Sequence, residues 1–414
     1  MPDTSPPAVS VREVLGVPEF RAVLASSGLS ILGDQVARIA VALLVYERGG
    51  SAFAASATYA CSYLTWLVGG PALSALADRH RRRRLMVTCD LLRAVLVAVL
   101  VLPDLPLWVL FAVLVLVGLL APPFDSARSA LLPEVLEGER YVTGNAVSNT
   151  VAQAAQVGGF ALGGLLVGVA GARGALALDA LTFVVSGLLL AAGLRERPVP
   201  TGTTTLARDV REGVRLVVHD RGLRRLLGYG VLAAVVMIAP EGLAVPVADT
   251  LGGGAATTGL LTAAVPAGFL IGSFLLLRVP VDRRLDMVPR LVALACVPLL
   301  LTPLVDASWL VGLLWLLAGC FSAASLVINA AYMVAAPTGA RGRAYGVAVS
   351  ALMAVQGVTL LIGGALAESL DPRLAVTVLA AVALGLTSLL GLAPGRATPV
   401  PEPARSYGSA AVTR

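Results

Sequence analysis

Asp34 and Arg38 are residues of opposite charge, four positions apart, in an otherwise apolar stretch that covers residues 19–46. Four residues make about one turn of an α-helix, so both side chains lie on one helical face and can pair. At bilayer depth an ionisable side chain costs about 2.5–3.5 kcal/mol, so each needs a structural or functional reason. One interpretation is a carboxyl at Asp34 that takes up and releases a proton. The alternative is a buried ion pair that only fixes helix packing.

Glu241 is a further acid inside an apolar stretch, and it lies between Pro240 and Pro246. Proline interrupts helical hydrogen bonding, and a broken helix that lines a cavity suits a binding site. We therefore expect Glu241 to meet a cationic group of a substrate or to carry a proton. Two other acids, Asp179 and Glu368, lie nearer the ends of their stretches and are expected to be solvated or to cap helices.

The composition places these acids in a membrane protein. Apolar residues make up 57% of the 414 residues and charged residues only 14%, whereas soluble domains have about 45–50% and about 25%. A bilayer core of about 30 Å needs about 20 apolar residues of helix, because strands would leave backbone groups unpaired in lipid. We predict an all-α integral membrane fold with twelve transmembrane helices, at 19–46, 52–77, 85–102, 107–124, 142–170, 174–194, 223–248, 256–278, 287–304, 308–334, 344–369 and 373–392.

The placement of arginine predicts the orientation of these helices, because cytoplasmic loops carry an excess of positive charge. Of the 31 arginines, 26 fall in the tails and loops on one side, whereas the other side has Arg48, Arg173 and Arg373. The remaining two, Arg38 and Arg93, lie inside predicted helices. We therefore predict a multi-pass protein of the inner (plasma) membrane with both termini in the cytoplasm.

The longest loop separates the predicted helices into two sets of six. Within it, Leu206, Val210, Val214 and Val217 recur at helical spacing, which is typical of an interfacial helix on the inner leaflet, although a plain tether is compatible with the pattern. The predicted domains are a cytoplasmic N-terminal tail at 1–18, a six-helix half at 19–194, the cytoplasmic linker at 195–222, a second six-helix half at 223–392 and a cytoplasmic C-terminal tail at 393–414.

The two halves repeat part of their sequence. Gln156 precedes a Gly-Gly pair in the first half, and Gln356 precedes another such pair 200 positions later. This correspondence supports a parallel repeat of the kind that transporters use. In the first half, Gly159, Gly163 and Gly164 permit close approach of neighbouring helices.

Four polar side chains lie on otherwise apolar predicted helices. Two interpretations remain open, namely hydrogen bonds between helices and the lining of a central cavity. The residues are Gln153, Gln156, Asn329 and Gln356.

Four segments together resemble the major facilitator superfamily, in particular its drug:proton antiporter branch with macrolide-efflux and enterobactin-export proteins. They are LGDQVARIAVALLVYERGGS in the first predicted helix, GGPALSALADRHRRRRL after the second, PPFDSARSALLPEVLEGERYVTGNAVS after the fourth and GGFALGG in the fifth. The second segment is similar to the superfamily signature G-x-L-x-D-R-x-G-R-R. The fourth is similar to the antiporter signature G-P-x-x-G-G, with Phe160 in place of the proline.

The resemblance implies that the loop after the second helix is a gate. It implies that Asp78 faces the cytoplasmic end of helix 344–369, and that Arg82 pairs with an acid at the end of the fourth helix. Asp125 stands there, with Arg128 beside it. The alternative is that these acids merely cap and solvate helix ends. Two further groups are assigned to the gate, namely Arg79 in the signature and the pair of Asp90 and Arg93 in the third helix.

Several function classes are excluded by the sequence. Lysine is absent, so no Walker A loop exists. The two histidines, His80 and His219, lie in basic loops, so we expect no metal, no cofactor and no enzyme chemistry. The basic loops lack interleaved aromatic residues, which argues against nucleic-acid binding.

These observations together predict a monomeric transporter in membrane lipid. We expect secondary active transport by alternating access, with proton-coupled export of a hydrophobic or amphipathic small molecule, such as a drug, an antibiotic or a siderophore-like compound. The alternatives are a uniporter or importer on the same fold, and a non-transporting membrane accessory protein.

Overall fold

The computed structural model describes residues 9–73, 76–197 and 206–392, and every regular element in these ranges is a helix. The first half of the chain forms α1 (Val11–Leu15), α2 (Pro18–Gly49), α3 (Ala52–Leu73), α4 (Leu76–Arg79), α5 (Arg82–Leu100), α6 (Leu107–Leu119), α7 (Ala121–Val135) and α8 (Glu139–Gly193). The second half forms α9 (Leu206–His219), α10 (Arg221–Thr250), α11 (Ala255–Leu277), α12 (Val281–Leu300), α13 (Ser308–Ser322), α14 (Ala324–Ala335), α15 (Arg341–Ala367) and α16 (Pro372–Leu392), with short 3₁₀ turns at Thr302–Leu304 and Thr338–Ala340.

Nine helical stretches in the described ranges are long and apolar enough to cross a membrane. One of them, α8, breaks at Gly171, where φ is 72° and ψ is 168°; a side chain would disfavour this backbone conformation, so glycine permits the turn between two crossings. Helices α3 and α5 are the remaining crossings, and arginines at the start of α5 account for its lower apolar character. The pairs α6–α7 and α13–α14 each form one crossing, which gives twelve.

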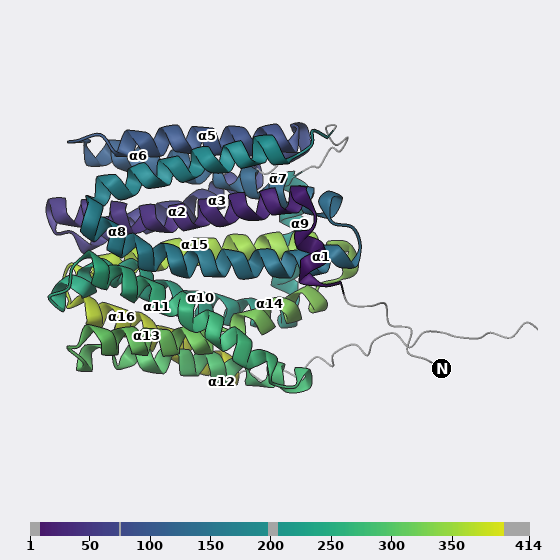
Figure 1. Cartoon of the computed structure of the whole chain (residues 1–414). Helices are drawn as coiled ribbons and strands as arrows, with labels where there is room; N and C mark the ends of the chain where they lie inside the picture. The colour runs from purple at the N-terminus through teal and green to yellow at the C-terminus, as the bar shows by residue number, and fades with distance from the viewer. Residues whose placement is uncertain (1–8, 74–75, 198–205, 393–414) are drawn as a thin grey trace, which may run out of the picture.

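The crossings form two six-helix halves, α2–α8 and α10–α16, which lie side by side (Figure 1). Helix α3 packs against α15, and α8 packs against α11, across the boundary between the halves. The predicted all-α fold is therefore confirmed. We call the end of the bundle that carries α1 and α9 the α9 end, and the opposite end, where α2 meets α3, the far end.

The fourth crossing differs from its predicted range of 107–124. Helix α7 begins at Ala121 and continues to Val135. Pro122 and Pro123 lie in its first turn, where proline is tolerated because those N–H groups have no helical acceptor. The predicted range ended before Asp125, whereas α7 continues through the charged residues Asp125 and Arg128, so the crossing ends about eleven residues later than expected.

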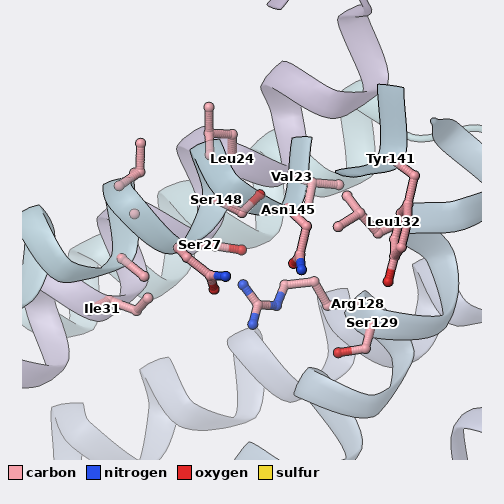
Figure 2. A pocket seen from close by; sticks show the side chains of 14 residues that line it. Val23, Leu24, Ser27, Ile31, Arg128, Ser129, Leu132, Tyr141, Asn145 and Ser148 are labelled. Atoms are coloured by element: carbon pink, nitrogen blue, oxygen red, sulfur yellow. The ribbon is translucent and has the colours of Figure 1, made fainter. Parts of the chain in front are cut away.

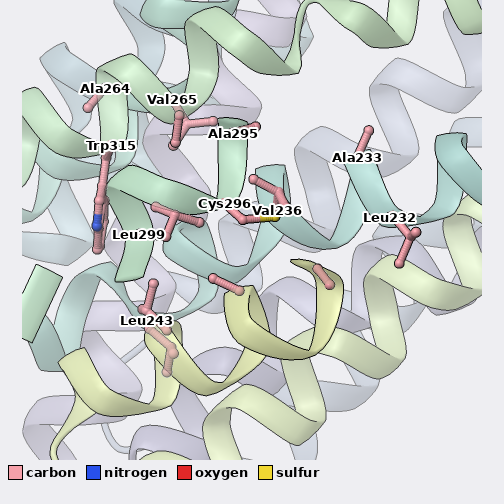
Figure 3. Packing of buried hydrophobic residues seen from close by; sticks show 14 of the residues in the cluster. Leu232, Ala233, Val236, Leu243, Ala264, Val265, Ala295, Cys296, Leu299 and Trp315 are labelled. Atoms are coloured by element: carbon pink, nitrogen blue, oxygen red, sulfur yellow. The ribbon is translucent and has the colours of Figure 1, made fainter. Parts of the chain in front are cut away.

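The core of the second half packs around Trp315, which is completely buried among small and branched side chains such as Ala264, Val265, Cys296 and Leu299 (Figure 3). Its indole N–H donates to Thr302 Oγ1 at 3.3 Å, so the buried polar atom has a partner. Helices α11 and α13 approach each other closely through glycines. A Cβ atom on Gly268, Gly272 or Gly319 would lie 1.9–2.1 Å from a backbone oxygen of the facing helix.

Candidate functional site in the central cavity

A cavity of about 370 Å³ lies between the two halves and extends from the middle of the bundle toward the α9 end. Its walls are mostly apolar and include Leu226, Ile238, Val265 and Phe269. Ten polar or ionisable side chains from both halves line it, and six of them are Tyr63, Gln153, Gln156, Glu241, Asn329 and Gln356.

Arg38 and Glu241 form an ion pair across the boundary between the halves. The distance from Arg38 Nη1 to Glu241 Oε1 is 3.3 Å, and the Glu241 side chain is only 9% exposed. Arg38 also donates to the Tyr63 hydroxyl at 3.4 Å, with its guanidinium 5.4 Å from the ring centre. Arg38 therefore pairs with Glu241, whereas the sequence placed Asp34 on the same helical face as its partner.

A second cavity of about 100 Å³ lies inside the first half. Four ionisable residues line it, namely Asp34, Arg38, Arg93 and Asp179. Arg38 thus lines this inner cavity and also contacts Glu241 in the central cavity. A change in the charge of one cavity can therefore affect the other cavity through the position of the Arg38 side chain.

Asp179 is a buried acid that sequence reasoning placed nearer solvent. Its side chain is 1% exposed, so the expectation that it is solvated was wrong. The signal was present, because Asp179 lies eight residues beyond the break at Gly171 and a helix rises about 1.5 Å per residue, which puts the carboxyl about 12 Å deep.

Asp90 and Arg93 are both buried but have separate partners. Asp90 Oδ2 accepts from Ser186 Oγ at 2.5 Å, and Ser186 Oγ is 2.7 Å from Ser26 Oγ. The guanidinium of Arg93 lies 5.3 Å from the ring centre of Phe124, with the ring of Phe183 at 5.5 Å. Within the described ranges these two charged residues share no ion pair.

Hydrogen bonds close the far end of the boundary between the halves. Glu368 accepts from Ser51 Oγ at 2.8 Å and from the Phe53 backbone N–H at 2.9 Å. Tyr46 donates to Asp249 at 3.0 Å. Glu368 follows the last residue of α15 and caps the start of α3, so its predicted capping role is confirmed.

Glycines allow the backbones of the halves to touch at the same end. A Cβ atom on Gly164 of α8 would lie 2.4 Å from the carbonyl oxygen of Ala255 and 2.7 Å from the Cα of Gly259 in α11. Two other predicted packing glycines, Gly159 and Gly163, instead face α2 within the first half. Added Cβ atoms there would lie 2.7 Å from the Leu32 oxygen and 3.0 Å from the Val36 Cα, respectively.

Comparison with known proteins agrees with this architecture. A sequence model described as Major Facilitator Superfamily matches residues 23–283, which is more than half of the chain. The chain belongs to the major facilitator superfamily. The resemblance drawn from the four sequence segments is thereby confirmed.

Relatives of this superfamily member include named efflux proteins. Macrolide efflux protein A of Streptococcus pyogenes is 25% identical over 267 residues, which cover 62% of this chain and 66% of that protein, just under two thirds of its length. The multidrug efflux pump Tap of Mycobacterium tuberculosis is 24% identical over 367 residues, which cover 84% of this chain and 86% of that protein.

Solved structures of other transporters share the fold. A bacterial homologue of the human lysosomal transporter Spinster, in an inward-facing and occupied conformation, has a TM-score of 0.73 at 13% identity and covers 94% of this chain and 97% of its own. The nucleoside transporter NupG has a TM-score of 0.72 at 12% identity, with 90% and 98% covered.

The basic run that carries the superfamily signature is held by acids and carbonyls at the α9 end. Arg81 and Arg84 bind the two carboxylate oxygens of Glu196 at 2.7 and 2.6 Å. The hydrogen bond from Arg84 and the charges of its neighbours hold the pKa of Glu196 below its usual value. Arg82 pairs with Glu134, and Arg83 donates to the Ala191 carbonyl.

The acid that pairs with Arg82 is not Asp125. Because α7 continues to Val135, the end of the fourth crossing is near Glu134, and Asp125 lies in the first turns of the helix. Asp125 instead pairs with Arg128 at 3.4 Å. The side chain of Asp78 lies outside the described residues, whereas Arg79 ends α4.

Arg128 enters a small cavity of about 70 Å³ between α2, α7 and α8 at the α9 end. Figure 2 shows the guanidinium reaching toward side chains of α2 and α8, among them Ser27, Asn145 and Ser148. Ser27 Oγ and Arg128 Nε are buried without a hydrogen-bond partner within the described part of the chain. Arg128 therefore lies between helices of the first half, and its place at the gate stays a prediction.

Helix α9 lies against the second half. A Cβ atom on Gly213 would lie 2.8 Å from the Arg343 carbonyl oxygen, and Val217 is buried. Glu212 pairs with Arg343 at the start of α15. Val214 is exposed, whereas the side chains of residues 206–210 lie outside the described residues.

Substituting Glu368 with alanine is expected to open the far end. The variant loses the cap on α3, an effect of about 1 kcal/mol, so the population with α3 and α15 separated should rise roughly fivefold. Spin labels on the two helices would report their separation. An unchanged distance distribution would show that Glu368 does not hold the far end closed.

The same contact predicts a pH dependence at the far end. Hydrogen bonds from Phe53 N–H and Ser51 lower the pKa of Glu368 below its ordinary value of 4.5. Because the pKa of Glu368 is lower in the closed form than in the open form, the contact stabilises the closed form at pH values above the ordinary pKa of 4.5. The stabilisation is lost as the pH falls through the lowered value. The labelled wild-type protein should therefore open at acidic pH, and the alanine variant should not respond.

Proposed function

We propose that the protein is a proton-coupled exporter of hydrophobic or amphipathic small molecules that carry a positive charge. The observation that carries this proposal is an acid, Glu241, on a mostly apolar cavity large enough for a drug-sized molecule, which typically binds in pockets of about 300–1,000 Å³. The apolar walls suit the hydrophobic part of such a substrate. The carboxylate suits its ammonium group.

Arg38 supplies the link between substrate and proton. A substrate cation at Glu241 competes with the guanidinium of Arg38, which now lies 3.3 Å from that carboxylate. Once displaced, Arg38 remains on the same helical face as Asp34, four residues away, and both line the inner cavity. A positive charge near Asp34 favours its ionised form, so substrate binding expels a proton.

The direction of transport follows from the orientation that arginine placement predicts. With the α9 end in the cytoplasm, the central cavity faces inward while Glu368, Asp249 and Gly164 help to close the outer end. Substrate then binds from the cytoplasm as the proton leaves to that side. Rocking of the two halves would carry the substrate outward, where a new proton displaces it.

Transport in liposomes tests this proposal. The purified protein is reconstituted, and a lipophilic cation such as ethidium, a macrolide and an uncharged dye of similar size are offered under an imposed pH gradient. We expect the two amine-bearing probes to move against the proton flux. If none of the probes responds to the gradient, proton-coupled export of such compounds is wrong.

Substituting Glu241 with glutamine is expected to weaken cation binding specifically. A charge-assisted hydrogen bond contributes about 1.5–3 kcal/mol, so the half-saturating ethidium concentration should rise roughly 10- to 100-fold. The matched control is Glu139→Gln, the same chemical change at an exposed position on α8. An equal effect in both variants would remove Glu241 from the site.

A further inference from the structure

Asp34 and Asp179 are two carboxyls that share the inner cavity of the first half. They come from α2 and α8, which pack tightly there. A Cβ atom on Gly33, the residue before Asp34, would lie 2.4 Å from Asp179 Oδ1. Asp179 is therefore pressed against the backbone of α2 beside Asp34.

Neither carboxyl has a cationic partner within the described ranges. Asp179 Oδ1 accepts from Thr182 Oγ1 at 3.2 Å, and Oδ2 is buried without a hydrogen-bond partner. Arg38 is engaged by Glu241, and Arg93 lies over aromatic rings. An unpaired buried carboxylate costs several kcal/mol, so a group in this position takes up a proton instead.

The charges around the cavity fix how many protons are needed. The acids are Asp34, Asp90, Asp179 and Glu241, and the bases are Arg38 and Arg93. Asp125, on the neighbouring α7, is balanced by Arg128. Four acids against two bases leave two negative charges in excess. Asp90 Oδ1 is also buried without a hydrogen-bond partner within the described ranges, but Arg93 lies one helical turn away on the same face of α5 and supplies a compensating charge. In the substrate-free form, Asp34 and Asp179 each hold one proton.

A bound cation changes this balance by one proton. With the substrate on Glu241, Arg38 is free to compensate Asp34, which then ionises. No base is left for Asp179, and a second carboxylate in the same cavity would repel the first. Asp179 therefore keeps its proton while Asp34 loses and regains one.

We propose that Asp179 is a permanently protonated carboxyl, so that Asp34 alone titrates and one proton is exchanged for each monovalent cation. This inference rests on the proposed function, because it uses the competition between substrate and Arg38. The cation bound at the two aspartates is a proton and not sodium, since two arginines line the same small cavity. The exchange of one proton for one cation moves no net charge across the membrane.

Infrared spectroscopy of the purified protein tests the protonation of Asp179 without any transport. The wild type should show carboxylic acid C=O bands at neutral pH. Asp179→Asn should remove one band that does not respond to ethidium, and Asp34→Asn should remove the band that disappears when ethidium binds. Asp371→Asn is the control, because hydrogen bonds from Arg373 lower the pKa of Asp371 and keep it ionised. A spectrum of Asp179→Asn identical to the wild type would overturn the proposal.

A milder variant guards against misfolding. Thr182→Val removes the hydroxyl that donates to Asp179, so it should shift the frequency of the Asp179 band and leave its intensity. A band that stays in place contradicts the assignment.

Transport measurements test the stoichiometry separately. Asp179→Asn imitates the protonated form and should keep ethidium export coupled to the pH gradient, with no drive from membrane potential alone. Loss of coupling in this variant, flux driven by potential, or spectra that depend on sodium would each contradict the one-proton exchange. The loss of a carboxylic acid band in Asp179→Asn can be measured without ethidium, so this part of the infrared test does not depend on ethidium being a substrate.

Discussion

Substituting Asp34 with asparagine is expected to separate substrate movement from the pH gradient. A one-proton exchanger concentrates its substrate about tenfold for each pH unit, because one unit is equivalent to about 1.4 kcal/mol. The variant side chain is neutral at every pH and cannot release a proton when Arg38 approaches. We therefore expect ethidium to equilibrate across the liposome membrane, with no accumulation at any imposed gradient.

The measurement is ethidium accumulation against the size of the gradient, in wild type and variant at equal protein density. Substrate affinity should stay near the wild-type value, since Asp34 lines the inner cavity and Glu241 lines the central one. The matched control is Asp104→Asn, which makes the same change in a loop at the far end. Accumulation by Asp34→Asn that still follows the gradient would exclude Asp34 as the coupling residue.

Substituting Gly164 with valine is expected to stop transport by blocking closure of the far end. The added side chain would meet backbone atoms of Ala255 and Gly259 at 2.4–2.8 Å, and backbone cannot move aside as a flexible side chain can. Overpacking of this kind costs about 1–3 kcal/mol, which shifts the balance of the two states by about one to two orders of magnitude. The initial rate of export should fall accordingly.

Gly168→Val is the control for helix propensity, because Gly168 lies one turn further along α8 and a Cβ atom added there would have nothing within 4 Å. It should transport at nearly the wild-type rate. Both variants should remain monodisperse and bind ethidium. Equal rates in the two variants would mean that the α8–α11 contact does not need to close during transport.

Much of the fold followed from local sequence. Apolar length set the twelve crossings, because a bilayer of fixed thickness accepts only helices of that length. The predicted fourth crossing was too short because it ended with the apolar stretch, whereas the helix continues through Asp125 and Arg128. The position of Pro122 and Pro123 within the first turn of α7 depends on the structure around them.

The polar residues of the site could be predicted from the sequence, but the ion pairs that they form could not. The lining of the cavity by Gln153, Gln156 and Gln356 was one of two open interpretations. Helical spacing predicts which residues share one side of a helix, but it does not predict whether another helix or a cavity lies next to that side. The partner of Arg38 was not accessible, since Glu241 is 203 residues away and the contact depends on how the halves dock. Asp179 was expected nearer solvent although its distance from the turn at Gly171 indicates a deeper position, and its packing on Gly33 of α2 could not be predicted from the sequence.

The ion pairs around the basic run also limit how far the halves can separate. Glu196 and Arg197 are fastened to the first half through Arg81, Arg84 and Glu19. Helix α9, which begins at Leu206, rests on the second half. Eight residues, 198–205, connect Arg197 with the first residue of α9. The end-to-end distance of a segment of this length cannot exceed about 30 Å when the chain is fully extended. The length of this segment sets an upper bound on the width of the opening at the α9 end, so deleting residues from it should lower the largest size of probe that is transported.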